Sequence, residues 1–262
     1  MTSEDDGQQY DTLTRLPDSG LAVLLLAACA TASAHPSPVA ITSPTVTSSI
    51  VPSPSSRLTP SPTAPASTPA PYKGFTKTIY LTFGDGPNPT WTPEILSLLE
   101  AHGARASFFV IGENAKAWPG LVEREARDGD TVGDHTWSHP NLTALSGSAV
   151  WAELARDRLL ITALTGKAPS LWRPPYEAFN RSVIAVASGL GLTMQLWSVS
   201  TGDWQLPGTN VIVSRVMSAL HSGMVVLFHD GGGKTRSETV AAVGILIPEL
   251  QAAGYRVAAL PA

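Results

Sequence analysis

The sequence contains a single cysteine among 262 residues, which excludes a disulfide scaffold and a zinc site built from several thiolates. No run of 18 or more apolar residues is present, so no segment has the length of an ordinary transmembrane helix. Neither sign of charge dominates the larger part of the chain, since residues 72–262 carry 15 Lys and Arg against 16 Asp and Glu. A general nucleic-acid or anionic-membrane binder would present a basic face. We therefore expect neither of them as a partner.

Proline and tryptophan are distributed unevenly along the chain. Ten of the 22 prolines lie between residues 36 and 71, and all seven tryptophans lie between residues 91 and 204. The chain therefore divides near residue 72 into a proline-rich front and a back of about 190 residues, which is the size of one ordinary domain. We predict a leader over 1–34, a linker over 35–75 and a folded domain over 76–262.

The leader has features of an export signal. Residues 21–30 (LAVLLLAACA) are too short to span a bilayer but have the length of a secretory h-region. Leu26–Cys29 resembles the lipobox of bacterial lipoproteins, in which the cysteine is lipidated, whereas Ala32–Ala34 resembles an ordinary cleavage site. Acidic residues before this stretch fit a signal poorly, so the true translation start and the cleavage point stay open. We predict lipidation at Cys29 and a secreted or surface-anchored protein of a bacterial envelope, with membrane contact through that anchor alone.

Residues 35–71 consist mainly of Pro, Ser, Thr and Ala and carry almost no charge. Such a composition cannot bury enough apolar surface to offset the entropy of ordering the chain. We expect an extended tether that reaches on the order of 100 Å, at about 3.1 Å per residue. That length would let a membrane-anchored domain reach into a cell wall.

From residue 76 onward, strand-like and helix-like segments alternate. We predict strands over 78–83, 107–111, 131–132, 171–172, 192–197, 224–228 and 255–260, and helices over 92–102, 115–128, 148–164, 181–190, 210–220 and 239–252. Thr92 and Asn180 are the expected helix caps. About seven strands, each but the last followed by a helix, predict a parallel sheet that is open or closed into a barrel. In either form, chemistry belongs at the C-terminal ends of the strands.

Polar clusters follow five of these predicted strands. They are the segments 84–87 (GDGP), 134–139 (DHTWSH), 173–176 (RPPY), 203–204 (DW) and 229–230 (HD). His135 and His139 are spaced so that two imidazoles can meet one cation, and Asp85 is the best-placed third ligand. Two histidines and one carboxylate leave positions open for water and substrate, as in catalytic zinc sites. A lone pair of histidines at this spacing is more often an ordinary surface pair, but the position at strand ends favours a metal.

The remaining polar residues have both a catalytic and a structural interpretation. His229 ends an apolar strand and is a candidate general acid, although a buried core histidine would look the same. Asp203 could orient His229. Arg173 precedes two prolines that fix its backbone, and its guanidinium serves either catalysis or a structural ion pair. Three aromatic residues near the same strand ends could bind sugars or simply fill the core: Trp137, Trp204 and Tyr176.

The motifs TFGDGP, HTWSH, RPPY, the DW of STGDW, and VLFHD occur in this order over about 150 residues. Together they resemble the polysaccharide deacetylases, the NodB-homology domain of carbohydrate esterase family 4. The resemblance covers essentially all of residues 76–262. It implies a distorted (β/α) barrel of about seven parallel strands. It also implies removal of N- or O-acetyl groups from chitin oligomers, peptidoglycan, xylan and similar polymers.

The resemblance implies roles for individual residues. Asp85, His135 and His139 would bind one divalent metal ion, expected to be zinc, with Co, Mn or Ni as alternatives. His229 would be the catalytic acid that protonates the leaving amine, and Asp203 would tune it.

The substrate side of the site follows from the same resemblance. The backbone N–H of Tyr176, with the metal, would stabilise the oxyanion. Trp204 and the strand before His229, which includes Leu227, would line the acetyl pocket, and Trp137 is a further predicted substrate contact. Arg173 would hold the catalytic base. A polysaccharide or oligosaccharide is the expected substrate, and we expect a monomer.

The sequence departs from the family at that base. The family motif is TFDDGP, whose first aspartate deprotonates the metal-bound water, and Gly84 occupies its position here. Ser200 stands where the family usually has an aspartate, and Glu177 replaces the glycine that usually follows RPPY. Loss of a positioned general base typically lowers the rate by about 10²- to 10⁴-fold. Asp134 and Glu177 are the nearby carboxylates that could substitute.

Three functions are therefore consistent with the sequence. The first is a metal-dependent polysaccharide N-deacetylase that acts on peptidoglycan or chitin-like glycans, with reduced activity. The second is a catalytically impaired glycan-binding relative at the cell surface. The third is an O-acetyl esterase acting on a polymer such as xylan, which has less need of an acid that protonates an amine.

Overall fold

The computed structural model describes residues 75–262. The predicted leader over 1–34 with Cys29, and the linker over 35–75 apart from its last residue, lie outside these residues. None of the helices that the structure describes is long and apolar enough to cross a membrane.

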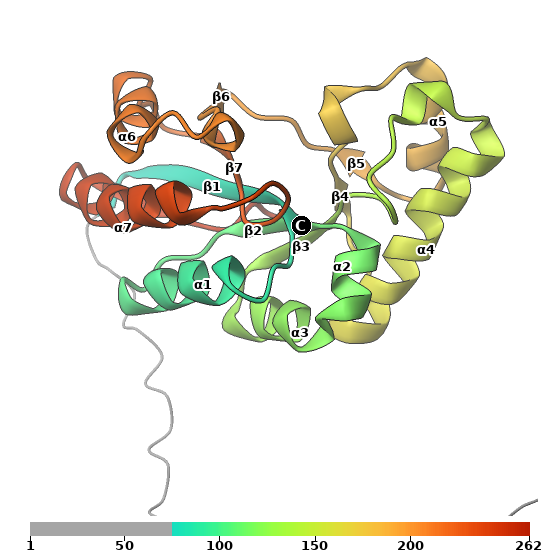
Figure 1. Ribbon diagram of the computed structural model, residues 1–262, viewed down its shortest axis with the longest axis horizontal. Coiled ribbons are helices and arrows are strands. Elements are labelled where there is room, and N and C mark those ends of the chain that lie inside the picture. Colours follow the sequence, from blue (N-terminus) through green and yellow to red (C-terminus); the bar gives the residue numbers. More distant parts are fainter. Residues whose placement is uncertain (1–74) are drawn as a thin grey trace, which may run out of the picture. The chain divides into compact units, whose positions relative to one another are not determined.

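A single parallel sheet organises the described domain (Figure 1). Its strands are β1 (Lys77–Gly86), β2 (Ser107–Val110), β3 (Thr131–Asp134), β4 (Leu171–Trp172), β5 (Thr193–Met194), β6 (Val199–Ser200), β7 (Met224–His229) and β8 (Tyr255–Val257). Their order is β5-β4-β3-β2-β1-β7-β6, and β8 pairs with the start of β1. No pairing joins β5 to β6 among residues 75–262, so the curled sheet is an open, distorted (β/α) barrel, as predicted.

The strand predicted over 192–197 is shortened to β5, and the unpredicted β6 follows it, which raises the strand number from seven to eight within residues 75–262. The segment changes its neighbour part-way. Gln195 N–H donates to the Trp172 carbonyl of β4, whereas Ser198 N–H donates to the Val225 carbonyl of β7. Periodicity cannot reveal such a change, because it reports which side of a strand is buried and not which neighbouring strand the segment pairs with.

Seven α-helices connect the strands: α1 (Trp91–Ala101), α2 (Gly112–Ala117), α3 (Pro119–Asp128), α4 (Gly147–Thr165), α5 (Arg181–Gly189), α6 (Thr209–Ser218) and α7 (Ser237–Ala252). The single helix predicted over 115–128 is wrong, because Trp118 and Pro119 divide it. Proline disfavours helical geometry in the preceding residue and itself starts a new helix well. Asn180 caps α5 as predicted, accepting from Val183 N–H at 3.0 Å. Thr92 is not a cap, since its hydroxyl donates to Asp230 instead.

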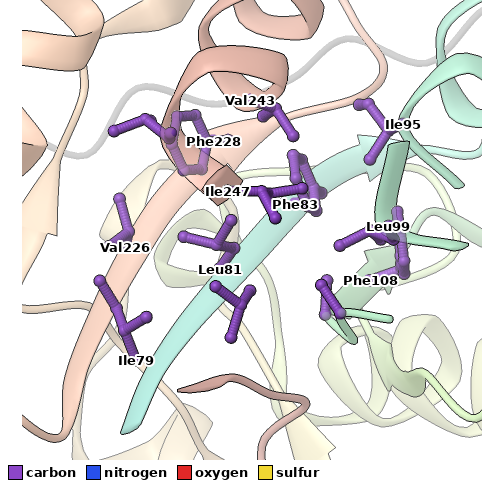
Figure 2. Packing of buried hydrophobic residues seen from close by; sticks show 14 of the residues in the cluster. Ile79, Leu81, Phe83, Ile95, Leu99, Phe108, Val226, Phe228, Val243 and Ile247 are labelled. Atoms are coloured by element: carbon purple, nitrogen blue, oxygen red, sulfur yellow. The ribbon is translucent and has the colours of Figure 1, made fainter. Parts of the chain in front are cut away.

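The main hydrophobic core lies between β1, β7 and the helices α1 and α7 (Figure 2). The ring of Phe83 stacks on those of Phe108 and Phe228, with centroids 5.2 and 5.5 Å apart. Full burial of such a side chain contributes about 1.5–3 kcal/mol. This packing fixes the ends of β1 and β7, and in their register Gly84 pairs with His229. The residues that follow Phe83 and Phe228 are therefore held side by side.

Candidate active site

A cleft of about 570 Å³ lies at the C-terminal ends of the central strands. It is lined by Gly84, Asp85, His135, His139, Arg173, Pro174, Tyr176, Glu177, Trp197, Ser200, Trp204, Leu227 and His229. All five polar clusters of the sequence contribute to this lining. The prediction that the chemistry gathers at the strand ends is thus consistent with the fold.

Asp85, His135 and His139 converge at one point of the cleft. Asp85 Oδ1 lies 3.3 Å from the Nε2 atoms of both histidines. Asp85 and His139 have left-handed φ angles of 67° and 59°. For non-glycine residues, such angles cost on the order of 1–3 kcal/mol each and are concentrated at functional sites. The Asn114 side-chain amide donates to the Asp85 carbonyl at 2.9 Å and helps to hold this backbone.

The protonation states of these residues suit a metal. His135 Nδ1 lies 2.7 Å from the Arg173 carbonyl oxygen. A nitrogen that faces a carbonyl must carry the proton, so Nε2 keeps its lone pair. Burial lowers the pKa of His135, which favours the neutral imidazole. Burial acts to raise the pKa of Asp85, but the facing side chains of His135 and His139 hold it well below its usual range.

Two of the three spacings between these atoms are those of a tetrahedral zinc site, and all three ligand atoms lie within 4.8 Å of one another. Two atoms about 2.0–2.1 Å from a tetrahedral zinc ion lie about 3.3–3.4 Å from each other. The distances from Asp85 Oδ1 to His135 and His139 Nε2 match that value. Within residues 75–262, this is the one group of three such side chains that could hold a metal. Its fourth position would stay open for water or substrate.

His229 and Asp203 form a fixed pair on the other side of Gly84. His229 Nδ1 lies 2.8 Å from Asp203 Oδ1, and the His229 N–H donates to Asp203 Oδ2 at 2.9 Å. The Thr239 hydroxyl donates to the same Oδ2 at 2.8 Å. Burial acts to raise the pKa of Asp203, but these contacts, above all with His229, lower it. The ionised carboxylate places the proton of the neutral ring on Nδ1 and leaves Nε2 as the reacting nitrogen.

Arg173 lies beneath the cleft and is 1% exposed. Its Cζ lies 4.0 Å from the centroid of the Phe109 ring and 5.5 Å from that of Trp197. Nε donates to the Gln195 carbonyl at 3.1 Å. Burial lowers the pKa of the guanidinium to about 9, which leaves it charged at neutral pH. The structural ion pair considered for Arg173 is not found within residues 75–262.

The aromatic residues singled out from the sequence fall into two groups. Tyr176 and Trp204 line the cleft and are 72% and 56% exposed, so both are free to contact a substrate. The Tyr176 ring also contacts that of His139 edge-on, with centroids 4.7 Å apart. Trp137 is buried, is not among the lining residues, and stacks against Arg156. Its substrate contact stays a prediction without support from the cleft.

Gly84 gives no side chain to the cleft, and the two nearby carboxylates differ in access. Asp134 is fully buried, is absent from the lining, and accepts the Thr136 N–H. Glu177 is exposed and lines the cleft. Of the two substitutes considered from the sequence, Glu177 alone has access to water in the cleft.

The comparisons with known proteins bear on this constellation. A profile of the polysaccharide deacetylase family matches residues 73–195. A chitooligosaccharide deacetylase of Bradyrhizobium sp. (strain ANU 289) is 38% identical over 197 residues, which cover 71% of this chain and 90% of that protein. The chain belongs to the polysaccharide deacetylase family.

Peptidoglycan deacetylases of the family are also similar to this chain. The peptidoglycan-N-acetylglucosamine deacetylase PgdA of Listeria monocytogenes is 36% identical over 179 residues, covering 68% of this chain but 37% of that longer protein. The structure of peptidoglycan deacetylase PdaC from Bacillus subtilis matches with a TM-score of 0.65 at 34% identity, covering 70% of this chain and 88% of that one.

A further structural relative bears on the departure at Gly84. It is a family 4 carbohydrate-esterase pseudoenzyme from Bacillus anthracis, with a TM-score of 0.65 and 29% identity, covering 70% of this chain and 64% of that one. A mutant of that pseudoenzyme has restored enzymatic activity. The polysaccharide deacetylase fold therefore occurs both in enzymes and in a relative without activity.

Some residues around this deacetylase site were not found from the sequence. The carboxylate of Asp157, on α4, accepts the backbone N–H of His135 at 3.2 Å. Asp157 falls on the same helical face as Leu154 and Ile161, and an acid on an apolar face was the available signal. Trp197 lines the cleft beside Arg173. The sequence pattern places it in a predicted strand and gives no separate signal of a role in the site.

Proposed function

We propose that this protein is a metal-dependent hydrolase that removes N-acetyl groups from a polymer of N-acetylglucosamine, chitin-like or peptidoglycan. One observation carries the proposal. Asp85, His135 and His139 face the His229–Asp203 pair across a single open cleft, with Gly84 between the two groups. In this proposal the first group binds a metal ion, and the His229–Asp203 pair transfers a proton.

The ion held by Asp85, His135 and His139 would lower the pKa of a bound water and polarise the acetyl carbonyl. Zinc is the expected ion because two imidazoles and one carboxylate are typical of its catalytic sites. The Tyr176 backbone N–H would donate to the oxyanion that develops on the carbonyl. Leu227 and Trp204 would contact the acetyl group and the sugar.

His229 would finish the reaction by releasing the amine. As the C–N bond breaks, the protonated Nε2 gives its proton to the leaving nitrogen, which would otherwise depart as a strongly basic anion. Asp203, fixed by Thr239 and by the His229 N–H, stabilises the imidazolium and keeps the ring aimed at the cleft.

A glycan-binding relative without turnover is the second candidate function. The specific observation in its favour is Gly84, together with the likeness to a pseudoenzyme of the same family. Both functions need the same metal and the same open cleft. They differ in whether acetate is released.

Zinc-loaded protein is expected to release acetate from tetra-N-acetylchitotetraose, and chelation should abolish the release. His135→Ala removes one of three ligands, so bound zinc should fall from one ion per chain to near zero, and acetate release should stop. His221→Ala is the matched control, because His221 is exposed and lies outside the cleft. Unchanged zinc content in His135→Ala would show that the metal site is assigned wrongly. Zinc binding and glycan binding without acetate release would favour the second candidate.

We also propose a monomer that acts at the cell surface, tethered by a lipid on Cys29 through the linker over 35–75. The support is the lipobox-like sequence before Cys29 and the Pro-, Ser- and Thr-rich composition of the linker, which predicts an extended tether. Cys29→Ser should move the protein from the membrane fraction to the culture medium. An unchanged distribution would argue against lipid anchoring.

A further inference from the structure

Arg173 is a buried cation whose outer donors lack an acceptor. Nη1 and Nη2 are buried and have no hydrogen-bond partner within residues 75–262. The rings of Phe109 and Trp197 hold the guanidinium in place but do not replace a hydrogen-bonding anion. A buried charged donor destabilises the fold unless an acceptor reaches it. The arrangement is therefore complete only when an anion joins it.

Gly84 leaves room for such an anion. Gly84 pairs with Phe109 on the neighbouring strand, so a side chain at position 84 would share a face of the sheet with the ring on which Arg173 lies. A Cβ built on Gly84 would lie 3.6 Å from His135 Nε2 and 3.7 Å from His229 Cδ2, at ordinary contact distances. Gly84 and Arg173 both line the cleft.

We propose that Gly84 and Arg173 form a site for a small free carboxylate, formate or acetate, that acts as the base of the reaction. The proposal rests on the N-deacetylase function proposed above. An aspartate side chain is an acetate group joined to the backbone through its methyl carbon, so a free carboxylate supplies the chemistry that position 84 lacks. Formate fits best, because it has no methyl carbon to crowd the Gly84 backbone.

The proton balance of the step is simple. The bound carboxylate takes one proton from water as the water oxygen bonds to the acetyl carbon. His229 Nε2 gives one proton to the leaving nitrogen as the C–N bond breaks, and the free amine departs together with acetic acid, which loses its proton to solvent to become acetate. The bound carboxylic acid then loses its proton to solvent, and His229 regains one from solvent. The carboxylate is regenerated and no oxidant or reductant is needed.

Two sources of the carboxylate are chemically equivalent at this site. One is a free anion, and the reaction itself releases acetate, so product would accelerate its own formation. The other is a carboxylate carried by the glycan, such as the lactyl group of a peptidoglycan fragment. The burial of Arg173 favours the free anion, since a group tethered to the glycan would have to reach the buried guanidinium past the sugar.

Binding can be measured without turnover. Carbon-13-labelled formate, followed by NMR line broadening on zinc-loaded protein, should bind the natural protein at least about 10-fold more tightly than Gly84→Asp, whose own carboxylate fills the site. Arg173→Met should weaken binding to a similar degree. Formate held by the metal alone would bind Gly84→Asp equally well, and that outcome would overturn the proposal.

Reaction rates provide the second test of the proposal. The released amine is measured instead of acetate, so that acetate can be added to the assay. Formate should accelerate deacetylation of tetra-N-acetylchitotetraose by the natural protein about 10-fold or more relative to chloride at equal ionic strength. Acetate should act more weakly and propionate least, while Gly84→Asp should not respond. In acetate-free buffer, progress curves of the natural protein should bend upward.

The failure modes are separable. If Gly84→Asp is active and the natural protein ignores formate, the carboxylate site is wrong while the N-deacetylase function stands. If both proteins are inactive on every glycan, the N-deacetylase function is wrong. If the natural protein is active without formate and Glu177→Gln removes that activity, Glu177 is the base and the proposal is overturned. A last outcome concerns the source of the carboxylate. If a lactyl-bearing fragment is deacetylated without formate while the neutral oligosaccharide needs formate, the substrate supplies the carboxylate. That result would overturn the proposal of a free anion.

Discussion

A Gly84→Asp variant is expected to release acetate from tetra-N-acetylchitotetraose about 10²- to 10⁴-fold faster than the natural protein in the same zinc-containing buffer. The gain is that of a positioned general base. Gly84 lies in β1 between His135 and His229, and a Cβ there meets both neighbours at ordinary contact distances. A Cβ at position 84 therefore needs no movement of the backbone.

Arg173 would also stabilise an aspartate carboxylate at position 84. Its Nη atoms are buried without a partner among the described residues, and position 84 shares a face of the sheet with the Phe109 ring against which the guanidinium lies. An ion pair would keep the new aspartate ionised at neutral pH, which is the form that accepts a proton. The variant should thus gain a base that is both placed and charged correctly.

Gly84→Ala is the matched control, because it adds the Cβ without the carboxylate and should leave the rate within a few-fold of the natural protein. Initial rates of amine release, measured with excess oligosaccharide, distinguish the three proteins. A rise in Gly84→Ala would mean that rigidity at position 84, and not proton transfer, limits the reaction. Equal rates for Gly84→Asp and the natural protein would mean that another base is already in use.

The sequence was sufficient to predict the fold class and to select residues that the structure brings to one cleft, because the motifs sit where strands end. The C-terminal ends of β1, β3, β6 and β7 carry or precede Asp85, His135, His139, Asp203 and His229, and a parallel sheet brings such positions together. Metal-ligand chemistry then selects among them. The strand ends could therefore be assigned without knowing the tilt of any strand.

Features that depend on distant neighbours were missed for a physical reason. The segment 195–198 passes from β4 to β7, and no local pattern signals which strand it will pair with. The sequence pattern at Thr92 predicts a helix cap, but its hydroxyl donates to the buried Asp230, which lies 138 residues later in the chain. The orphaned donors of Arg173 also become visible only when every neighbouring acceptor has been placed.

The second large effect is expected at His229. In the Gly84→Asp background, where rates are easily measured, His229→Asn should lower N-deacetylation by about 10²- to 10⁴-fold. Asparagine keeps a polar contact with Asp203 but cannot carry a proton to the leaving nitrogen. The glycan affinity should change little, because His229 acts on the departing amine. The measurement is kcat and KM for tetra-N-acetylchitotetraose, with zinc content checked in parallel.

The leaving group provides the sharper test, because amines and phenols differ in their need for an acid. A sugar amine cannot leave without a proton, whereas p-nitrophenoxide leaves readily as the anion. Hydrolysis of p-nitrophenyl acetate by His229→Asn should therefore fall less than about 10-fold. If both substrates lose activity equally, His229 does something other than protonate the amine, such as supporting the fold of the cleft. If neither loses activity, the acid lies elsewhere, and an esterase becomes the better description of this barrel.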